Sequence, residues 1–94
     1  MAIVFEWDPR KESLNLRKHG ISFAEASTVL DDGLARIFKD TDHSEIEARE
    51  IIIGHSAAER LLLVIFTERK PDRIRIISAR EVSRQERRDY EEAS

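Results

Sequence analysis

The chain has 94 residues and no cysteine, and its 16 lysines and arginines are outnumbered by 19 aspartates and glutamates, for a net charge of −3. This length supports one domain with a modest core, and the lack of cysteine excludes a disulfide framework and a thiolate metal site. The net charge disfavours sequence-independent nucleic-acid binding, which needs many cations. No apolar run suits a membrane span and no signal peptide is apparent, so we expect a single cytoplasmic domain over residues 1–94.

The first half of the chain predicts a strand followed by a helix. Residues 3–7 are β-branched and aromatic, which is typical of a strand. Asp8 and Pro9 then predict a helix that runs to about His19, with Asp8 as its N-cap and Gly20 as its left-handed stop.

A second helix is predicted directly after the first. Ser22 and Glu25 have the spacing of a capping box, and residues 31–33 end the helical pattern. The first helix has a thin apolar face, mainly Leu14 and Leu16, so we expect it to cover the sheet edge-on.

The second half predicts four strands and a final helix. The helix follows Ser83, which forms a second capping-box spacing with Glu86, and Tyr90 and Ala93 are its only apolar residues. Such a helix must lie on the surface, line a polar site or receive a partner. The order β-α-α-β-β-β-β-α predicts an α+β fold, with an antiparallel sheet and helices packed on one face. The four strands are expected at residues 34–38, 50–54, 61–67 and 73–78.

Positive charge is concentrated in one segment. Residues 69–88 hold eight lysines and arginines against three acids, a local charge of +5 in an acidic protein. The planar guanidinium group of arginine matches phosphate geometry bidentately, so the segment predicts a phosphate or nucleic-acid ligand.

Arg69 and Arg80 each end an apolar strand, from which their side chains are expected to lean toward a shared site. Arg80 also has the parity of Ile74 and Ile76, which predicts that it projects from the core-facing side of the sheet. The alternative is that both are surface arginines that pair with the glutamates beside them.

Other candidate residues lie outside this pair. His19 with Lys18 has the chemistry of a general acid–base next to a cation, although a histidine there also suits the end of a helix dipole. Tyr90 either stacks on a base or donates a proton, or it simply anchors the last helix on the sheet. Glu68, beside Arg69, is a candidate base or simply a solvated side chain.

Three other functions are disfavoured. His43 lies among acidic loop residues, but without a partner motif the metal-site signal is weak. Neither an HExxH motif nor a phosphate-binding glycine motif is present, so we expect neither a metal nor a nucleotide cofactor. The two early helices superficially fit a helix-turn-helix, yet the second has no arginine or lysine to contact DNA.

Short blocks along the chain match, in order, the pattern of one family. They include Lys-His-Gly at 18–20, Phe-Thr-Glu-Arg at 66–69 and Ile-Ser-Ala-Arg at 77–80, a specific combination. Read together, the blocks resemble the BrnT family, the toxins of a bacterial type II toxin–antitoxin system. All the matching positions are 5–8, 15, 18–26, 42–44, 49, 54, 66–69, 75–80, 86–87 and 90.

This resemblance implies a RelE-like fold and a ribonuclease that cuts RNA and arrests translation. It implies a BrnA-type antitoxin that binds the toxin in a hetero-oligomer, and operator DNA that is contacted only through the antitoxin. Carried over by position, the catalytic residues are Lys18, His19, Glu68, Arg69, Arg80 and Tyr90.

The mechanism that we expect is metal-independent attack of an RNA 2′-hydroxyl on the adjacent phosphate. His19 or Glu68 would remove the proton, and Lys18 would add positive charge. The main alternative is a non-catalytic module that docks a partner protein or nucleic acid through its arginine surface. The expected phosphate-binding residues are Arg69, Arg73, Arg75, Arg80 and Arg84.

Overall fold

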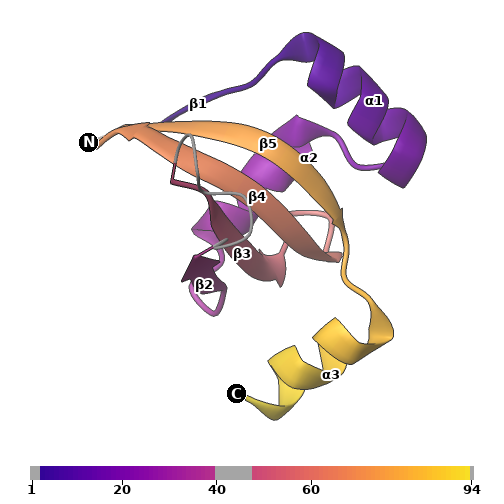
Figure 1. The fold of residues 1–94 in the computed structure, drawn as a ribbon. Coiled ribbons are helices and arrows are strands. Elements are labelled where there is room, and N and C mark those ends of the chain that lie inside the picture. Colours follow the sequence, from indigo (N-terminus) through magenta and orange to yellow (C-terminus); the bar gives the residue numbers. More distant parts are fainter. Residues whose placement is uncertain (1–2, 40–47, 94) are drawn as a thin grey trace.

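The protein is an α+β domain, as the sequence predicts, in which one five-stranded sheet carries helices on both of its faces (Figure 1). The computed structural model describes residues 3–39 and 48–93. No helix in these two ranges is long and apolar enough to cross a membrane. The elements are β1 (Val4–Glu6), α1 (Pro9–His19), α2 (Phe23–Thr28), the 3-10 helix η1 (Val29–Asp31), β2 (Arg36–Lys39), β3 (Glu50–His55), β4 (Leu61–Lys70), β5 (Arg73–Glu81) and α3 (Arg84–Glu92).

The sheet is mixed, which corrects the expectation of a purely antiparallel one. Its strand order is β1-β5-β4-β3-β2, and the neighbours from β2 to β5 are antiparallel. β1 instead pairs in parallel with the start of β5, with Phe5 opposite Ile74. A tight hairpin forces an antiparallel pair, but β1 and β5 are far apart in the chain and no hairpin joins them.

One face of the sheet, the core face, packs against the N-terminal helices. Phe23 and Ala26 of α2 are completely buried there, and Trp7 meets the Phe23 ring edge-on with centroids 6.2 Å apart. The core cluster consists of Ile21, Phe23, Ala26, Val29, Ile52, Leu62, Val64, Phe66, Ile74, Ile76 and Ala79.

A β-bulge in β5 overturns the predicted orientation of Arg80. Ile65 pairs with Ser78 but the next residue of β4 pairs with Ile76, so Ile77 is an extra residue in β5. One extra residue reverses the alternation beyond it. Ala79 therefore enters the core, and Arg80 projects from the opposite face, the second face.

α1 is anchored by an asparagine, not by the leucines that the sequence suggested. Leu14 and Leu16 are 59% and 45% exposed, whereas Asn15 is buried. The Asn15 Nδ2 group donates to the carbonyl oxygens of Ile21 (2.9 Å) and Ala79 (2.8 Å), and Oδ1 accepts from the Ala79 N–H group (3.1 Å). The helix thus lies edge-on along the part of β5 that β1 does not cover, as expected.

Both predicted ends of α1 and the predicted start of α3 are confirmed. Asp8 accepts from the Arg10 N–H group at 2.9 Å, and Gly20 ends α1 at φ 72° with its own N–H group on the Leu16 carbonyl. At Ser83 both halves of the capping box form.

The capping box at Ser22 is only half formed, because Glu25 has another partner. The Ser22 Oγ atom accepts from the Glu25 N–H group, but the Glu25 carboxylate accepts from Ser56 Oγ (2.7 Å) and Arg60 Nε (2.9 Å). The Arg60 guanidinium beside it lowers the pKa of Glu25. This network ties α2 to the β3–β4 hairpin.

α3 lies on the second face, so the expectation that all helices share one face is wrong. Ile53 lines a cavity with α3, whereas its neighbour Ile52 points into the core. None of the α3 residues is buried, as its polar sequence predicted. Figure 1 shows α3 on the side of the sheet opposite α1 and α2.

We expect Asn15→Leu to lower the free energy of unfolding by about 2–4 kcal/mol, because it leaves buried backbone groups of Ala79 and Ile21 without partners. Urea denaturation measures the change. Leu16→Ala, on the same helix but at an exposed position, is the control and should stay within about 0.5 kcal/mol of the unmodified protein. Equal stability of the Asn15 variant and the control would contradict this role of the amide.

Candidate active site

Arg69 and Arg80 lie at opposite ends of the β4–β5 hairpin, so the shared site predicted for them does not form. Arg80 pairs with Leu63 near the start of β4, whereas Arg69 lies beside the turn that leads into β5. At about 3.4 Å per residue, the six residues from Leu63 to Arg69 separate the two arginines by about 20 Å. Each arginine lies near the C-terminal end of its strand, as predicted. The C-terminal ends of two antiparallel neighbours lie at opposite ends of the hairpin, so the two arginines are far apart.

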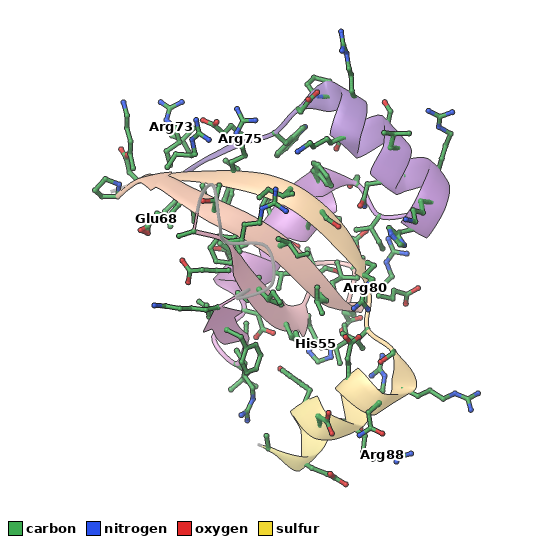
Figure 2. The ribbon with its side chains drawn as sticks, viewed as in Figure 1. His55, Glu68, Arg73, Arg75, Arg80 and Arg88 are labelled. Carbon is green, nitrogen blue, oxygen red and sulfur yellow. The ribbon has the colours of Figure 1, made fainter. Side chains whose placement is uncertain are left out.

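The arginines near the hairpin turn form a separate group at that end (Figure 2). Arg73 and Arg75 project from β5 on the second face, and their guanidinium groups contact Glu6 of β1 at 3.2 and 3.0 Å. Arg73 and Arg75 lower the pKa of Glu6. Glu68 and Arg69 are exposed at the same end of β4.

Arg80 is held by a carboxylate from α3. Its NH1 and NH2 groups donate to Oε1 and Oε2 of Glu86, each at 2.8 Å, in a bidentate pair. This pairing lowers the pKa of Glu86 to about 2 and raises that of Arg80. The guanidinium has the geometry that binds a phosphate, and an internal carboxylate occupies it. Arg84, also expected to bind phosphate, is exposed at the start of α3.

Lys18 and His19 line a different hollow. It has a volume of about 200 Å³ and lies between the last turns of α1 and the bulged part of β5, where Ile77 and Ser78 form its other wall. Neither Arg69 nor Arg80 lines it. The structure thus brings Lys18 and His19 together but places them in a hollow that the two arginines do not line.

A histidine that the sequence analysis did not select lies on the second face. His55 has the parity of Ile53, and its imidazole ring meets the Tyr90 ring edge-on with centroids 6.0 Å apart. Its Nδ1 atom lies 3.9 Å from Asp32 Oδ2, which also accepts from the His55 N–H group at 2.8 Å. His55 therefore has a carboxylate on one side and a phenol ring on the other.

Gly54 allows Asp32 to approach β3 this closely. A Cβ atom at position 54 would lie 2.7 Å from the Ala35 Cβ atom and 2.9 Å from Asp32 Oδ2, closer than real contacts allow. The backbone N–H groups of His55 and Leu34 both donate to Asp32 and lower its pKa. The carboxylate beside His55 is thus ionised at neutral pH.

Tyr90 is fixed over the edge of the sheet that β2 forms. Its hydroxyl donates to the Leu34 carbonyl at 3.2 Å, and the Arg36 guanidinium lies 5.8 Å from the centroid of its ring. Tyr90 therefore anchors α3 on the sheet and also presents its ring beside His55.

A row of four residues crosses the second face under α3. Arg36, Ile53, Leu63 and Arg80 are successive cross-strand partners in β2, β3, β4 and β5. His55 belongs to the same face, two strands from Arg80 and two residues along the strand direction, which places their Cα atoms about 12 Å apart. Figure 2 shows His55 and Arg80 at the same end of the sheet.

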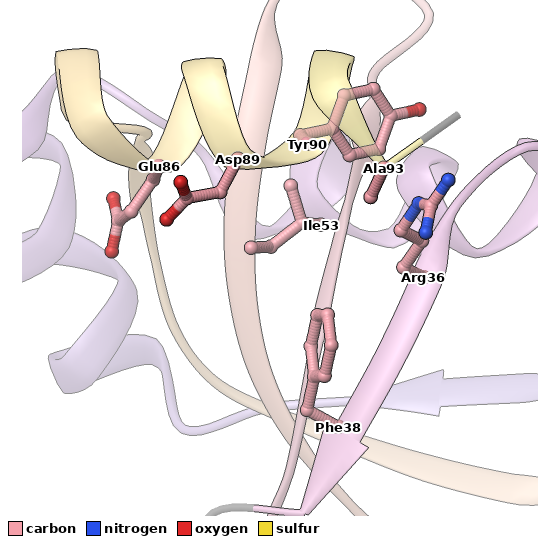
Figure 3. Close-up of a pocket in the computed structure, with 7 residues that line it drawn as sticks. All are labelled: Arg36, Phe38, Ile53, Glu86, Asp89, Tyr90 and Ala93. Atoms are coloured by element: carbon pink, nitrogen blue, oxygen red, sulfur yellow. The ribbon is translucent and has the colours of Figure 1, made fainter.

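α3 and this face enclose a cavity of about 400 Å³. Figure 3 shows α3 above the strands, with Glu86 and Asp89 toward one end of the helix and Tyr90 and Ala93 toward the other. The lining residues are Arg36, Phe38, Ile53, Glu86, Asp89, Tyr90 and Ala93. The candidate active site is therefore this face, with Arg80 and His55 at one end of the sheet and the cavity beside them.

No group of three or more histidine and acidic side chains among residues 3–39 and 48–93 is arranged to hold a metal ion. His43 and the acids around it, the weak metal candidate of the sequence, lie outside the described residues.

Comparison with known proteins identifies the family. The model of the ribonuclease toxin BrnT of type II toxin–antitoxin systems matches residues 7–86. The chain belongs to the BrnT family. It is also similar to the 1.1 Å crystal structure of the Brucella abortus ribonuclease toxin BrnT, with 28% sequence identity, a TM-score of 0.66, and coverage of 89% of this chain and 99% of the Brucella chain. No protein in the curated set matches.

Membership of the BrnT family confirms the resemblance that the sequence blocks indicated. The family consists of ribonuclease toxins of type II toxin–antitoxin systems, so its members have RNA as a substrate and an antitoxin as a partner. The match covers α1, α2, the strands from β2 to β5 and the first residues of α3, which include all the candidate residues except Tyr90.

The Arg80–Glu86 pair gives this BrnT family member a pH-dependent contribution to stability. The folded-state pKa of Glu86 is lowered from 4.5 to about 2, so the stabilisation is fully present above pH 4.5 and is lost as pH falls toward 2. We expect Glu86→Gln to lower the free energy of unfolding by about 1 kcal/mol at pH 6, because the pair is partly exposed, and by less at pH 3.

Chemical denaturation of both proteins at several pH values measures this difference. The glutamine side chain keeps an acceptor for the Ser83 N–H group, so the capping box can form in both proteins and only the charge differs. A difference that stayed constant from pH 6 to pH 3 would show that the charge of Glu86 does not carry the effect.

Proposed function

We propose that this protein is a metal-independent endoribonuclease toxin that cleaves RNA, inhibits translation and is neutralised by a BrnA-type antitoxin in a hetero-oligomer in the cytoplasm. Operator DNA is contacted only through the antitoxin. We extend the proposal to a RelE-like fold, which the antiparallel β2–β5 meander with two preceding helices on its core face supports. The observation that carries the enzymatic proposal is the second sheet face, where Arg80 and His55 lie at one end.

In the proposed reaction, the RNA 2′-oxygen attacks the adjacent phosphorus and the bond from phosphorus to the 5′-oxygen breaks. The products are a 2′,3′-cyclic phosphate and a 5′-hydroxyl, which takes its proton from water. Arg80 binds the scissile phosphate and stabilises its extra negative charge, usually the largest contribution to this kind of catalysis. The phosphate competes with Glu86 for the same N–H groups.

His55 is the proposed base that removes the 2′-proton. Asp32 supports this role, because its carboxylate lies 3.9 Å from Nδ1 on one side of the ring. Tyr90 holds the other side of the ring. The sequence analysis named His19 or Glu68 as the base. His19, which lies with Lys18 in a separate hollow, is the competing candidate.

The remaining predicted residues have supporting roles in this proposal. Arg73 and Arg75 share the second face with Arg80, so they extend the surface that the RNA backbone contacts, and Arg84 continues it on α3. Glu68 and Arg69 contact the RNA at the hairpin end, away from the scissile phosphate.

We expect Arg80→Ala to reduce RNA cleavage by about 10²–10³-fold, since it removes the group that stabilises the charge on the phosphate. Labelled RNA, purified protein and excess chelator measure the rate and reveal the cyclic-phosphate ends. Arg10→Ala, an exposed arginine on α1, is the matched control and should retain full activity. Equal cleavage by the two variants would remove Arg80 from the mechanism.

If neither the unmodified protein nor any variant cleaves RNA while all of them remain folded, the non-catalytic docking module becomes the better interpretation. Cleavage that depends on added metal and disappears in chelator would contradict the metal-independent mechanism.

Substitution of the two histidines separates the candidate bases. We expect His55→Ala to reduce cleavage by at least about 10²-fold and His19→Ala to reduce it by less than about threefold, because only His55 lies on the face of Arg80. Circular dichroism and urea denaturation verify that both variants are folded. The reverse result would move the base to the hollow of α1 and β5.

A further inference from the structure

The cavity between α3 and the second face has the volume and the aromatic lining residues that suit a flat aromatic ligand. Its volume is about 400 Å³. Phe38 of β2 is 49% exposed, although it lines the cavity together with the apolar Ile53 (Figure 3). A half-exposed phenylalanine in a cavity is a stacking platform of the kind that single-stranded RNA uses.

The opposite wall is also planar and is held in place. The Tyr90 ring is fixed by its hydrogen bond to Leu34, and the Arg36 guanidinium lies against the ring. An aromatic ring that is held in this way stacks on nucleobases.

Three charged side chains line this cavity. Arg80 engages the carboxylate of Glu86, so Asp89 and Arg36, which have opposite signs, determine which base the cavity suits. The Asp89 carboxylate accepts from Gln85 Nε2 at 2.8 Å and keeps further acceptor capacity, because a carboxylate has about four lone-pair sites. Arg36 contributes N–H donors. The cavity therefore offers acceptors from Asp89 and donors from Arg36.

Guanine is the base whose edges match this pair of groups. Its N1–H and N2–H₂ groups are adjacent donors that one carboxylate can accept together, whereas adenine, cytosine and uracil place an acceptor next to each donor. Its O6 and N7 atoms are adjacent acceptors that suit a guanidinium group.

We propose that this cavity binds one guanine base of the RNA and that Asp89 and Arg36 determine the preference for it. The inference rests on the proposed ribonuclease function, because it assigns the base next to the phosphate that Arg80 binds. Glu86 connects the two sites, since it lines the cavity and pairs with Arg80. A guanine in the cavity thus positions a neighbouring phosphate near Arg80.

Binding of the four nucleoside 5′-monophosphates, measured by isothermal titration calorimetry on the full chain, tests the proposal without requiring cleavage. We expect guanosine 5′-monophosphate to bind at least about tenfold more tightly than the other three. Asp89→Asn, which replaces one acceptor oxygen by a donor, should reduce this preference to less than about threefold. Glu92→Gln, an exposed acid of α3 outside the cavity, is the control and should leave it unchanged.

Phe38→Ala tests the stacking wall separately. It should weaken binding of all four nucleotides by about tenfold without changing their order, because stacking is available to every base. Equal affinities of the four nucleotides for the unmodified protein, or a guanine preference that survives Asp89→Asn, would overturn the proposal.

Cleavage of RNA with a single guanosine at varied positions distinguishes this proposal from the proposed function. Cuts at a fixed distance from the guanosine would support both the guanine site and the ribonuclease activity, provided that Asp89→Asn abolishes this positional preference. Guanosine monophosphate binding without any RNA cleavage would support the base site and contradict the ribonuclease. Cleavage that ignores guanosine would contradict the base site and leave the ribonuclease intact.

Discussion

The buried amide of Asn15 is the interaction on which the arrangement of the N-terminal half depends. With three hydrogen bonds it joins α1, the residue that leads into α2 and the outer edge of β5. The amide supplies the edge of β5 with the donor and acceptor that a further strand would otherwise provide, so α1 closes the sheet there. Because Lys18 and His19 lie one turn further along α1, the same contact also fixes their hollow against β5.

The parts of the fold that the sequence predicts well are those determined by neighbours in the chain. Asp8, Gly20 and Ser83 set helix ends through contacts within four residues, and the apolar runs of β3 to β5 form strands where expected. The direction of β1 and the bulge at Ile77 depend on pairing between distant segments, which a local pattern does not encode. The bulge matters most, since the orientation of Arg80 follows from it.

The sequence predicted the kind of chemistry in the candidate site, but not which residues the fold brings together there. An excess of arginine near the end of the chain indicated phosphate binding, but folding divides these arginines between the two ends of an antiparallel hairpin and pairs several with acids, Glu6 and Glu86 among them. His55 was missed because it follows an apolar strand directly and resembles a turn residue. His55 has the same parity as Ile51 and Ile53, and this parity, taken together with the polar last helix, is the signal that could have placed His55 on the second face.

The extra residue at Ile77 makes the function of β5 depend on the length of the strand as much as on its composition. Side chains before the bulge and after it obey opposite alternations, with Ile76 and Ala79 both in the core. Loss of one residue between them would restore a regular strand and turn Arg80 toward the core while every arginine remained in the chain. Among relatives of this protein, insertions and deletions within β5 should therefore be rarer than substitutions, because a change of strand length moves every later side chain to the wrong side of the sheet.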